Sequence, residues 1–580
     1  MFTIHRIRIE NFRRIRYLDI SLSHATLFIG PNNSGKTTLL NAVELAFSPD
    51  ACFLSESDFQ KNPDPKAPDP YLPAAVTVRI VPCGESGRPS PAFEDEDAYL
   101  KENACRDENG EYFAFRTTAE FSGGKIVLKR VQTRSWKAPC QELAPLGEAF
   151  IRNFPVISLG QYCGAGDELD QDKGRLRAFM ESFTEPLPEA THQALSSLLD
   201  YLAGTLAGAQ GAFGQDIAFD EEHLAKLFDR TLRDEATRLL SPGSRRIICL
   251  MGVISALALL RARSQSGSAK SFPVVIIDEP ELHMHPNAQR AIVQTVSKLS
   301  GLLAMTTYSP FVASSVDPRS YRTIQTEGSQ MRIRWLPKRM RPDELGSIRR
   351  LILRHRSEML FARAIIFAEG ITEEQLFEGL FRRYFGVSPS LLGISIIGVG
   401  GKSYEPFIRL ATALQKPFCI VSDNDGNTSE VLNRQVSCAT REQGLSEDSS
   451  GVFLLSRGCS IEHELVLKLN LREEIADTLL ELNLNGRSGE SGQAQEAREH
   501  FMHLSSQALI SKLSKKKAEY SFILGEIIAR NPYGKSVEES IPLACRKAFA
   551  KISRWLGIEP KDAPRANKNK VPDIPQQTNL

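Results

Sequence analysis

The feature that most constrains this chain is the stretch Gly-Pro-Asn-Asn-Ser-Gly-Lys-Thr-Thr, which begins at Gly30 and ends at Thr38. It fits the pattern G-x-x-x-x-G-K-[ST], in which a glycine-rich turn points its backbone N–H groups at phosphate oxygens. Gly35 lets the backbone turn, Lys36 brings a positive charge to the β- and γ-phosphates, and the Thr37 hydroxyl can ligate Mg²⁺. We therefore expect a nucleotide site, with contacts from Gly30, Asn33, Ser34, Gly35, Lys36, Thr37 and Thr38.

The segments around this loop have the order that such a site requires. Ala25–Ile29 is apolar throughout and predicts a buried strand, and Thr38–Phe47 has the apolar face of a helix. The helix would offer the positive end of its dipole to the phosphates. Upstream, Thr3–Phe12 and Ile15–Leu22 alternate apolar and polar residues, which predicts two strands joined by a turn.

A second nucleotide-site motif lies at Phe272–Pro280, where an apolar run is followed by two carboxylates. A buried strand of this kind would carry Asp278 to the edge of a sheet, where it can hold Mg²⁺ through water. Glu279 would then polarise the attacking water. The alternative is a core strand that ends in exposed acids, but the phosphate-binding loop upstream favours the first interpretation.

Length and composition set the broader class. With 580 residues the chain is too long for one core, and its 42% hydrophobic and 24% charged residues are ordinary for a globular protein. The formal net charge of +1 means that any nucleic-acid surface must be a local patch. The cysteines form no C-x-x-C pair, the N-terminus lacks the apolar run of a signal peptide, and the apolar stretch Ile247–Leu260 is too short to span a bilayer. We therefore expect a cytoplasmic protein with no membrane partner.

Acidic residues follow two expected strands in the C-terminal half. Ala364–Ala368 ends at Glu369, and Phe418–Ser422 ends at Asp423 and Asp425. Parallel strands of an open α/β sheet deliver such residues to one edge, where these folds bind their ligands. Three carboxylates close together would repel one another unless divalent cations neutralise them, and oxygen ligands suit Mg²⁺ or Mn²⁺. Three unrelated surface acids are the alternative.

The N-terminal motifs together resemble the ABC-type ATPases of DNA repair and chromosome maintenance. The resemblance rests on the strand pair, both nucleotide motifs, the signature-like loop Leu240–Ser244 and the strand in Leu302–Pro310. It implies that two heads form a dimer and that Ser241 and Gly243 of one head cap the ATP of the other. This chain departs from the pattern at Tyr308, where the group has a switch histidine.

Two further positions belong to this interpretation. The expected strand Phe154–Gly160 ends at Gln161, which we place at the nucleotide. His283 and His285 could form a metal pair by themselves, but beside an ATP site they fit the loop that crosses the dimer interface.

The C-terminal pattern, Glu-Gly followed about fifty residues later by Asp-x-Asp, resembles the Toprim domain of topoisomerases, primases and some nucleases. An ABC-type ATPase followed by a Toprim domain resembles the OLD (overcoming lysogenization defect) family, from residue 1 to about residue 530. Glu369–Glu373 is similar to that family's first acidic motif and Gly400–Lys402 to its glycine turn. Ser460–Leu465 is similar to its later acidic motif, which nominates Glu462 as a metal ligand.

The family also places a lysine before the last Toprim helix. Lys517 fits best, with Lys516 as the alternative. The resemblance implies an α/β protein with an ABC-type ATPase head and a helical insertion, followed by a Toprim (Rossmann-like) domain. The implied segments are 1–165 and 239–345 for the two lobes of the head, 166–238 for the insertion and dimerisation arm, 346–362 for a basic connector, 363–530 for the Toprim domain and 531–580 for a closing helix and polar tail.

The resemblance implies an ATP-linked, Mg²⁺- or Mn²⁺-dependent DNA nuclease that defends bacteria against phage. Such a protein would act as a homodimer or higher homo-oligomer, alone, beside a helicase, or beside a retron reverse transcriptase with its DNA–RNA product. The implied catalytic residues are Glu369, Asp423, Asp425, Glu462, Lys517 and Glu279. The implied metal ligands are Glu369, Glu373, Asp423, Asp425, Glu462, Thr37 and Asp278, and the nucleotide contacts beyond the loop are Asp278, Gln161, Ser241, Gly243 and Tyr308.

Two alternatives stay open at this point. One is a DNA-binding clamp of the repair type whose Toprim acids do not cut. The other is a topoisomerase, which would need a nucleophilic tyrosine in a separate DNA-binding domain that the sequence does not reveal.

Overall fold

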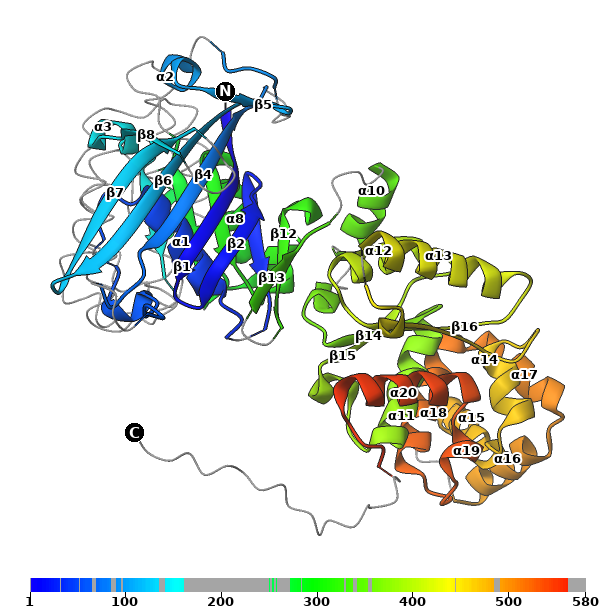
Figure 1. Cartoon of the computed structure of the whole chain (residues 1–580). Coiled ribbons are helices and arrows are strands. Elements are labelled where there is room, and N and C mark those ends of the chain that lie inside the picture. The colour runs from blue at the N-terminus through cyan, green and yellow to red at the C-terminus, as the bar shows by residue number, and fades with distance from the viewer. Residues whose placement is uncertain are drawn as a thin grey trace, which may run out of the picture. The chain divides into compact units, whose positions relative to one another are not determined.

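The computed structural model describes residues 2–31, 33–51, 53–64, 69–84, 90–94, 97–134, 141–160, 250, 253, 254, 257, 272–282, 284–327, 330–336, 342–352, 357–443, 445–484 and 491–561. The chain divides into two compact units, Met1–Ser357 and Glu358–Leu580 (Figure 1). Several predicted features lie outside the described residues, namely the insertion over 166–238, Gln161, Ser241, Gly243 and His283.

An antiparallel sheet in the first unit has the strand order β2-β1-β4-β6-β7-β8, with β5 paired to β6. The predicted strand pair is confirmed, and its register places Ile9 opposite Leu18. Asn11 and Arg13 make the turn between them with φ angles of 53° and 50°. The strands are β1 (Phe2–Phe12), β2 (Ile15–Ser21), β4 (Ala74–Pro82), β5 (Cys105–Asp107), β6 (Gly110–Ser122), β7 (Lys125–Thr133) and β8 (Glu142–Pro145).

The second sheet of this unit has the order β13-β12-β3-β11-β10-β9. Its strands are β3 (Ala25–Ile29), β9 (Val156–Leu159), β10 (Val274–Ile277), β11 (Leu302–Thr306), β12 (Tyr321–Glu327) and β13 (Gln330–Arg334). All of these except β13 pair in parallel. The carboxyl ends of β3, β11 and β10 therefore meet at one edge, which brings both nucleotide motifs together.

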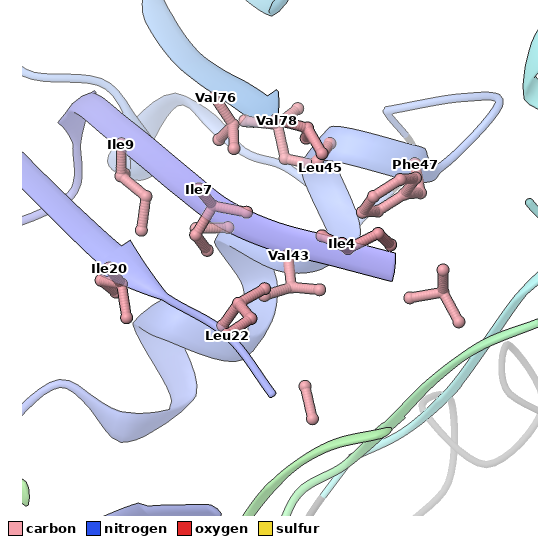
Figure 2. Packing of buried hydrophobic residues seen from close by; sticks show 14 of the residues in the cluster. Ile4, Ile7, Ile9, Ile20, Leu22, Val43, Leu45, Phe47, Val76 and Val78 are labelled. Carbon is pink, nitrogen blue, oxygen red and sulfur yellow. The ribbon is translucent and has the colours of Figure 1, made fainter. Parts of the chain in front are cut away.

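Helix α1 (Lys36–Phe47) packs between the two sheets and contacts both of them. Figure 2 shows its residues Val43, Leu45 and Phe47 among the apolar side chains of β1 and β4. Nearly every residue of α1 from Leu39 to Phe47 is buried, as expected for a helix that is apolar on all sides. This burial fixes the end of α1 that carries the phosphate-binding loop.

The other helices of the first unit are short or lie at its surface. They are α2 (Ala98–Glu102), α3 (Glu148–Ile151), α8 (Pro286–Leu299), α9 (Pro310–Ala313) and α10 (Pro342–Leu351). Within the apolar stretch Ile247–Leu260, the four described residues are helical and fully buried. None of the helices in the described part of the chain is long and apolar enough to cross a membrane.

The second unit contains a four-stranded parallel sheet in the order β15-β14-β16-β17. The strands are β14 (Ala364–Ala368), β15 (Ile394–Gly398), β16 (Phe418–Ser422) and β17 (Ser450–Leu454). After β14 the chain first adds β15 on one side and then β16 on the other. This reversal creates a topological switch point between β14 and β16, the place where open α/β sheets bind ligands.

Helices cover both faces of this sheet, with α12 and α13 on one face and α11, α18 and α20 on the other (Figure 1). The helices are α11 (Ile371–Phe385), α12 (Glu405–Ala413), α13 (Thr428–Gln443), α14 (Ile461–His463), α15 (Arg472–Leu484), α16 (Ser491–His503), α17 (Ser506–Lys515), α18 (Lys517–Arg530), α19 (Val537–Ser540) and α20 (Leu543–Leu556). The sequence predicted one closing helix within residues 531–580. The structure has two, because Pro542 has no N–H to continue the first.

Candidate functional site

The phosphate-binding loop, Gly30–Thr38, connects β3 to α1 through a turn in the left-handed region of the backbone. Gly35 has a φ of 93° and Asn33 a φ of 60°. A Cβ at Gly30 would lie 2.7 Å from Ser34 Oγ, so a side chain there would force a shift. Ser34 is buried, and its hydroxyl has no hydrogen-bond partner among the described residues. A phosphate oxygen would satisfy it.

Lys36 is turned onto its own loop. Its Nζ donates to the carbonyl oxygens of Gly30 at 3.0 Å and Pro31 at 2.9 Å, and to the hydroxyl of Tyr308. The ammonium also lies 4.0 Å from the centre of the Tyr308 ring. Burial lowers the pKa of Lys36, while the carboxylates of Glu279 and Asp278 oppose that shift. A bound phosphate would replace these uncharged partners with a charged one.

The end of β10 meets the loop at Asp278. Thr37 Oγ1 donates to Asp278 Oδ2 at 2.8 Å, and the Thr306 hydroxyl at the end of β11 donates to the other carboxylate oxygen. The hydroxyl and the carboxylate that we expect to hold Mg²⁺ are therefore side by side, and both are hard oxygen ligands of the kind Mg²⁺ prefers. Glu279 follows with a φ of 53°, and its N–H donates to Thr306 Oγ1 at 3.1 Å.

Tyr308 is held by a carboxylate that sequence reasoning missed. Glu281 Oε1 accepts the N–H groups of Tyr308 at 2.6 Å and Ser309 at 3.2 Å. Ser309 Oγ in turn donates to Gln289 Oε1 at 2.6 Å. Burial, followed by the carboxylates of Glu279 and Asp278, raises the pKa of Tyr308 to about 12. Its hydroxyl therefore stays a neutral phenol near neutral pH, and a tyrosine carries no positive charge in either protonation state.

The alternative of a metal pair formed by His283 and His285 is not tested, because His283 lies outside the described residues. His285 Nδ1 accepts the N–H of Asn287 at the start of α8. Within the described ranges, no three His, Cys, Asp or Glu side chains are already arranged as a closed set of metal ligands.

The second site lies in the other unit, at the carboxyl ends of three neighbouring strands. Glu369 follows β14, Asp423 and Asp425 follow β16, and Glu462 lies in α14 after β17. Together with Glu373 in the first turn of α11, these five residues form what we call the acidic site. Glu369 and Asp423 flank the switch point of the sheet.

The pKa of Asp423 reflects its burial and the charges of the acids around it. Burial, followed by the charges of Glu369, Glu373, Asp425 and Glu462, raises the pKa of Asp423 to about 7. Burial and the neighbouring carboxylates both disfavour the charged form of Asp423. A divalent cation would relieve this repulsion, and the donor set consists of oxygens alone.

Asp425 and Glu373 each have a protein partner. Lys402 Nζ lies 2.5 Å from Asp425 Oδ2 and, as the main cause, lowers the pKa of Asp425. Glu373 Oε2 accepts the N–H of Gly370 at 2.9 Å and thereby caps α11. A cation at Asp425 would exchange with Lys402, and because this ion pair is exposed, the exchange costs little.

Glu462 is almost completely buried and accepts three hydrogen bonds. Ser460 Oγ donates to it at 2.6 Å and Tyr520 Oη at 3.3 Å, and Lys517 Nζ lies 3.2 Å away. Burial alone would raise the pKa of Glu462, but the Ser460 and Lys517 contacts lower it below its usual value. Glu462 is therefore an ionised carboxylate that anchors Lys517.

Comparison with known proteins agrees with this arrangement. Residues 360–425 match the family described as Overcoming lysogenization defect protein-like, TOPRIM domain. Residues 2–117 match an AAA ATPase domain, and residues 166–314 match a further AAA domain. The OLD nuclease of Thermus scotoductus is 21% identical over 458 residues, which cover 73% of this chain and 82% of that protein. This chain is therefore similar to an OLD nuclease over most of its length, and it combines matches to ATPase domains with a match to an OLD-like TOPRIM domain.

Other relatives match over shorter segments. The Old nuclease of Escherichia phage P2 is 30% identical over 171 residues, which cover 28% of each protein. The C-terminal region of the OLD protein from Xanthomonas campestris pv. campestris is 18% identical, with 34% of this chain and 96% of that one covered, at a TM-score of 0.26. At a TM-score this low, the superposition does not by itself establish a common fold. The chain is an α/β protein with an ATPase head followed by a C-terminal TOPRIM domain.

Helix packing places Lys517 at the acidic site. Lys517 begins α18, which lies against α11 at a crossing where Gly379 meets Gly525. Ser521 Oγ donates to Gln375 Oε1 at 2.8 Å across the same interface. Of the two candidate lysines, Lys517 contacts Glu462, whereas Lys516 Nζ lies 3.7 Å from Glu519.

Sequence reasoning missed several residues around the carboxylates of the acidic site. Ser422 donates to Glu369, Tyr520 donates to Glu462, and Tyr404 is buried beside Ser422. The only available signal for Lys402 was its place in the glycine turn. No sequence signal marked Tyr404 or Tyr520, because a buried tyrosine in a helical pattern is ordinarily a core residue.

Proposed function

We propose that this protein is an ATP-binding DNA nuclease that cuts at the acidic site with Mg²⁺ or Mn²⁺. The observation that carries the proposal is the convergence of Glu369, Asp423 and Glu462, which follow three adjacent strands; burial, together with the charges of the neighbouring acids, raises the pKa of Asp423 to about 7. The carboxylates of an ordinary surface cluster would turn away from one another into solvent, which would weaken the repulsion between them. The names of the relatives from Thermus scotoductus and phage P2 support the same activity.

Each residue of the acidic site then has a task. Glu369, Asp423 and Asp425 would hold the cation, with Glu373 and Glu462 as further ligands. A bound divalent cation activates water and stabilises the leaving oxygen of a phosphodiester. Lys517 is half-exposed, and the Glu462 carboxylate raises the pKa of Lys517 against the effect of burial. Its ammonium can therefore neutralise charge on the scissile phosphate.

Exposed lysines next to this site fit a DNA backbone. Lys512, Lys515 and Lys516 are exposed around the end of α17, immediately before Lys517. Phosphate contacts of this kind supply sequence-independent affinity. The chain has a formal net charge of only +1, so such a patch would be local.

The head would bind ATP with Mg²⁺ held by Thr37 and Asp278, Lys36 on the phosphates and Glu279 as the residue that polarises water. Tyr308 stands where ABC-type ATPases have a switch histidine, so the nucleotide would meet a neutral side chain in place of one that can carry positive charge. We infer that hydrolysis is slow and that bound ATP acts mainly as a signal. We further propose that two heads dimerise, with Ser241 and Gly243 completing the site of the partner. A role in defence against phage, and a helicase or retron reverse transcriptase as partner, follow from the family resemblance alone.

The test is a cleavage assay on supercoiled and single-stranded DNA with Mg²⁺, Mn²⁺ or EDTA. We expect cutting that EDTA stops and that Asp423→Ala or Glu369→Ala abolishes, while ATP binding persists. Asp448→Ala is the matched control, because Asp448 is an exposed aspartate of the same unit with a side chain 80% exposed. Cleavage that survives both acidic-site substitutions would overturn the proposal.

A DNA-binding clamp of the repair type is the second candidate. One observation favours it: within the described residues, no three potential ligands are arranged to enclose a metal ion. DNA binding without cleavage under every metal condition would decide for the clamp. A topoisomerase is disfavoured, since Tyr404 and Tyr520 near the acids are fully buried and cannot reach a DNA strand. A covalent protein–DNA adduct would revive it.

A further inference from the structure

We propose that Tyr404 is a positioning residue of the acidic site, which orients the Glu369 carboxylate for its divalent cation through the Ser422 hydroxyl. This role depends on the metal-dependent function proposed above. The Tyr404 hydroxyl is buried, and no step of the proposed function uses it directly.

Tyr404 lies between the glycine turn and α12. Its side chain is fully buried, and within the described part of the chain its hydroxyl has no hydrogen-bond partner of ordinary geometry. Burial is the main cause that raises the pKa of Tyr404, and the charges of Glu369, Glu373 and Asp423 raise it further. The phenol therefore lies within the field of the acidic site. A core position without a function would favour phenylalanine, because a buried hydroxyl without a partner is unfavourable.

Ser422 connects Tyr404 to Glu369. Ser422 ends β16, and its Oγ donates to Glu369 Oε2 at 3.4 Å, which is long for such a bond. The hydroxyl of Tyr404 lies beside that of Ser422. A serine hydroxyl can accept a hydrogen bond while it donates another. A small movement would therefore complete a chain from Tyr404 through Ser422 to Glu369, in which each bond strengthens the next.

The glycine turn holds the backbone of the same glutamate. The N–H groups of Gly400 and Gly401 donate to the Glu369 carbonyl oxygen at 3.0 and 2.8 Å. These glycines have φ angles of 77° and 121°, which other residues rarely adopt. One loop therefore fixes the backbone of Glu369 and also carries Tyr404, whose hydroxyl lies beside the Ser422 that donates to the Glu369 side chain. Hydrogen-bond partners of metal ligands typically change metal affinity by about 10–100-fold.

The experiment measures Mn²⁺ binding to the nucleotide-free, full-length protein by electron paramagnetic resonance, together with the unfolding temperature without metal. We expect Tyr404→Phe to keep or raise the unfolding temperature and to weaken Mn²⁺ binding about tenfold. Ser422→Ala should weaken it to a similar extent. The double variant should bind no more weakly than either single variant, because both changes break one chain. Tyr384→Phe is the control, since Tyr384 lies at the far end of α11.

The outcomes separate the two proposals. Wild-type Mn²⁺ affinity in Tyr404→Phe, or losses that add in the double variant, would overturn the positioning role and leave the metal site intact. A lower unfolding temperature with unchanged affinity would make Tyr404 a packing residue and would also overturn it. If the wild type binds no more Mn²⁺ than Asp423→Ala, the metal site fails and the positioning role fails with it.

Discussion

Replacing Gly379 by alanine tests how the second unit places Lys517 at the acids. A Cβ on Gly379 would lie closer to the backbone of Gly525 than the 3.0 Å that real Cβ atoms keep. Carbon atoms in contact need about 3.5–4.0 Å, so α18 would have to move by roughly 1 Å. Overpacking of this kind costs about 1–3 kcal/mol, of which the better helix propensity of alanine offsets about 1 kcal/mol.

The same movement would draw Lys517, the first residue of α18, away from Glu462. A misplacement of roughly 1 Å near a reacting centre can lower the rate about a hundredfold. We expect Gly379→Ala to unfold a few degrees lower in a thermal scan and to cut DNA about a hundredfold more slowly, with ATP binding unchanged.

Gly525→Ala is the matched control at the same crossing. A Cβ there would lie 3.5 Å from its nearest neighbours, which is ordinary contact. This variant should be at least as stable as the wild type, because alanine favours the helix by about 1 kcal/mol, and it should cut normally. If the two alanine variants behave alike in both assays, the helix crossing does not position Lys517 and the reasoning is refuted.

Three further predictions concern the nucleotide site and the DNA surface. Lys36→Ala should lose ATP binding in a filter assay, whereas Glu279→Gln should bind ATP and barely hydrolyse it; wild-type turnover by the glutamine variant would reject Glu279 as the residue that polarises water. Tyr308→His should raise turnover roughly a hundredfold, because a positively charged donor in the transition state contributes about 2–3 kcal/mol, and a non-hydrolysable analogue should affect cleavage as ATP does. The signalling interpretation would be wrong if the wild type hydrolyses ATP quickly and the non-hydrolysable analogue cannot replace ATP in the cleavage assay. Lys512→Glu with Lys515→Glu should weaken DNA binding on every sequence and reduce its salt slope by about 2, and an unchanged slope would place the DNA elsewhere.

The nucleotide site was largely predictable because its parts are local in sequence. The glycine pattern at Gly30–Thr38 and the apolar strand before Asp278 each specify a turn or a strand end by themselves. Their meeting then follows from parallel strand pairing, which the sheet order confirms. Glu281 was not predictable in the same way. Its role depends on the loop after β10 folding back onto the N–H groups of Tyr308 and Ser309.

For the acidic site, the sequence by itself determined which carboxylates end which strands, since apolar strands and the acids after them are read directly along the chain. Only the tertiary structure decided that β14, β16 and β17 are neighbours, that Lys402 pairs with Asp425, and that Lys517 rather than Lys516 meets Glu462. Such pairings join segments tens of residues apart, and no periodic pattern encodes them. They depend on the direction in which each crossover returns to the sheet and on how closely two helices can approach. Helices α11 and α18 approach closely because Gly379 and Gly525 meet at their crossing. These two glycines lie far apart in the sequence.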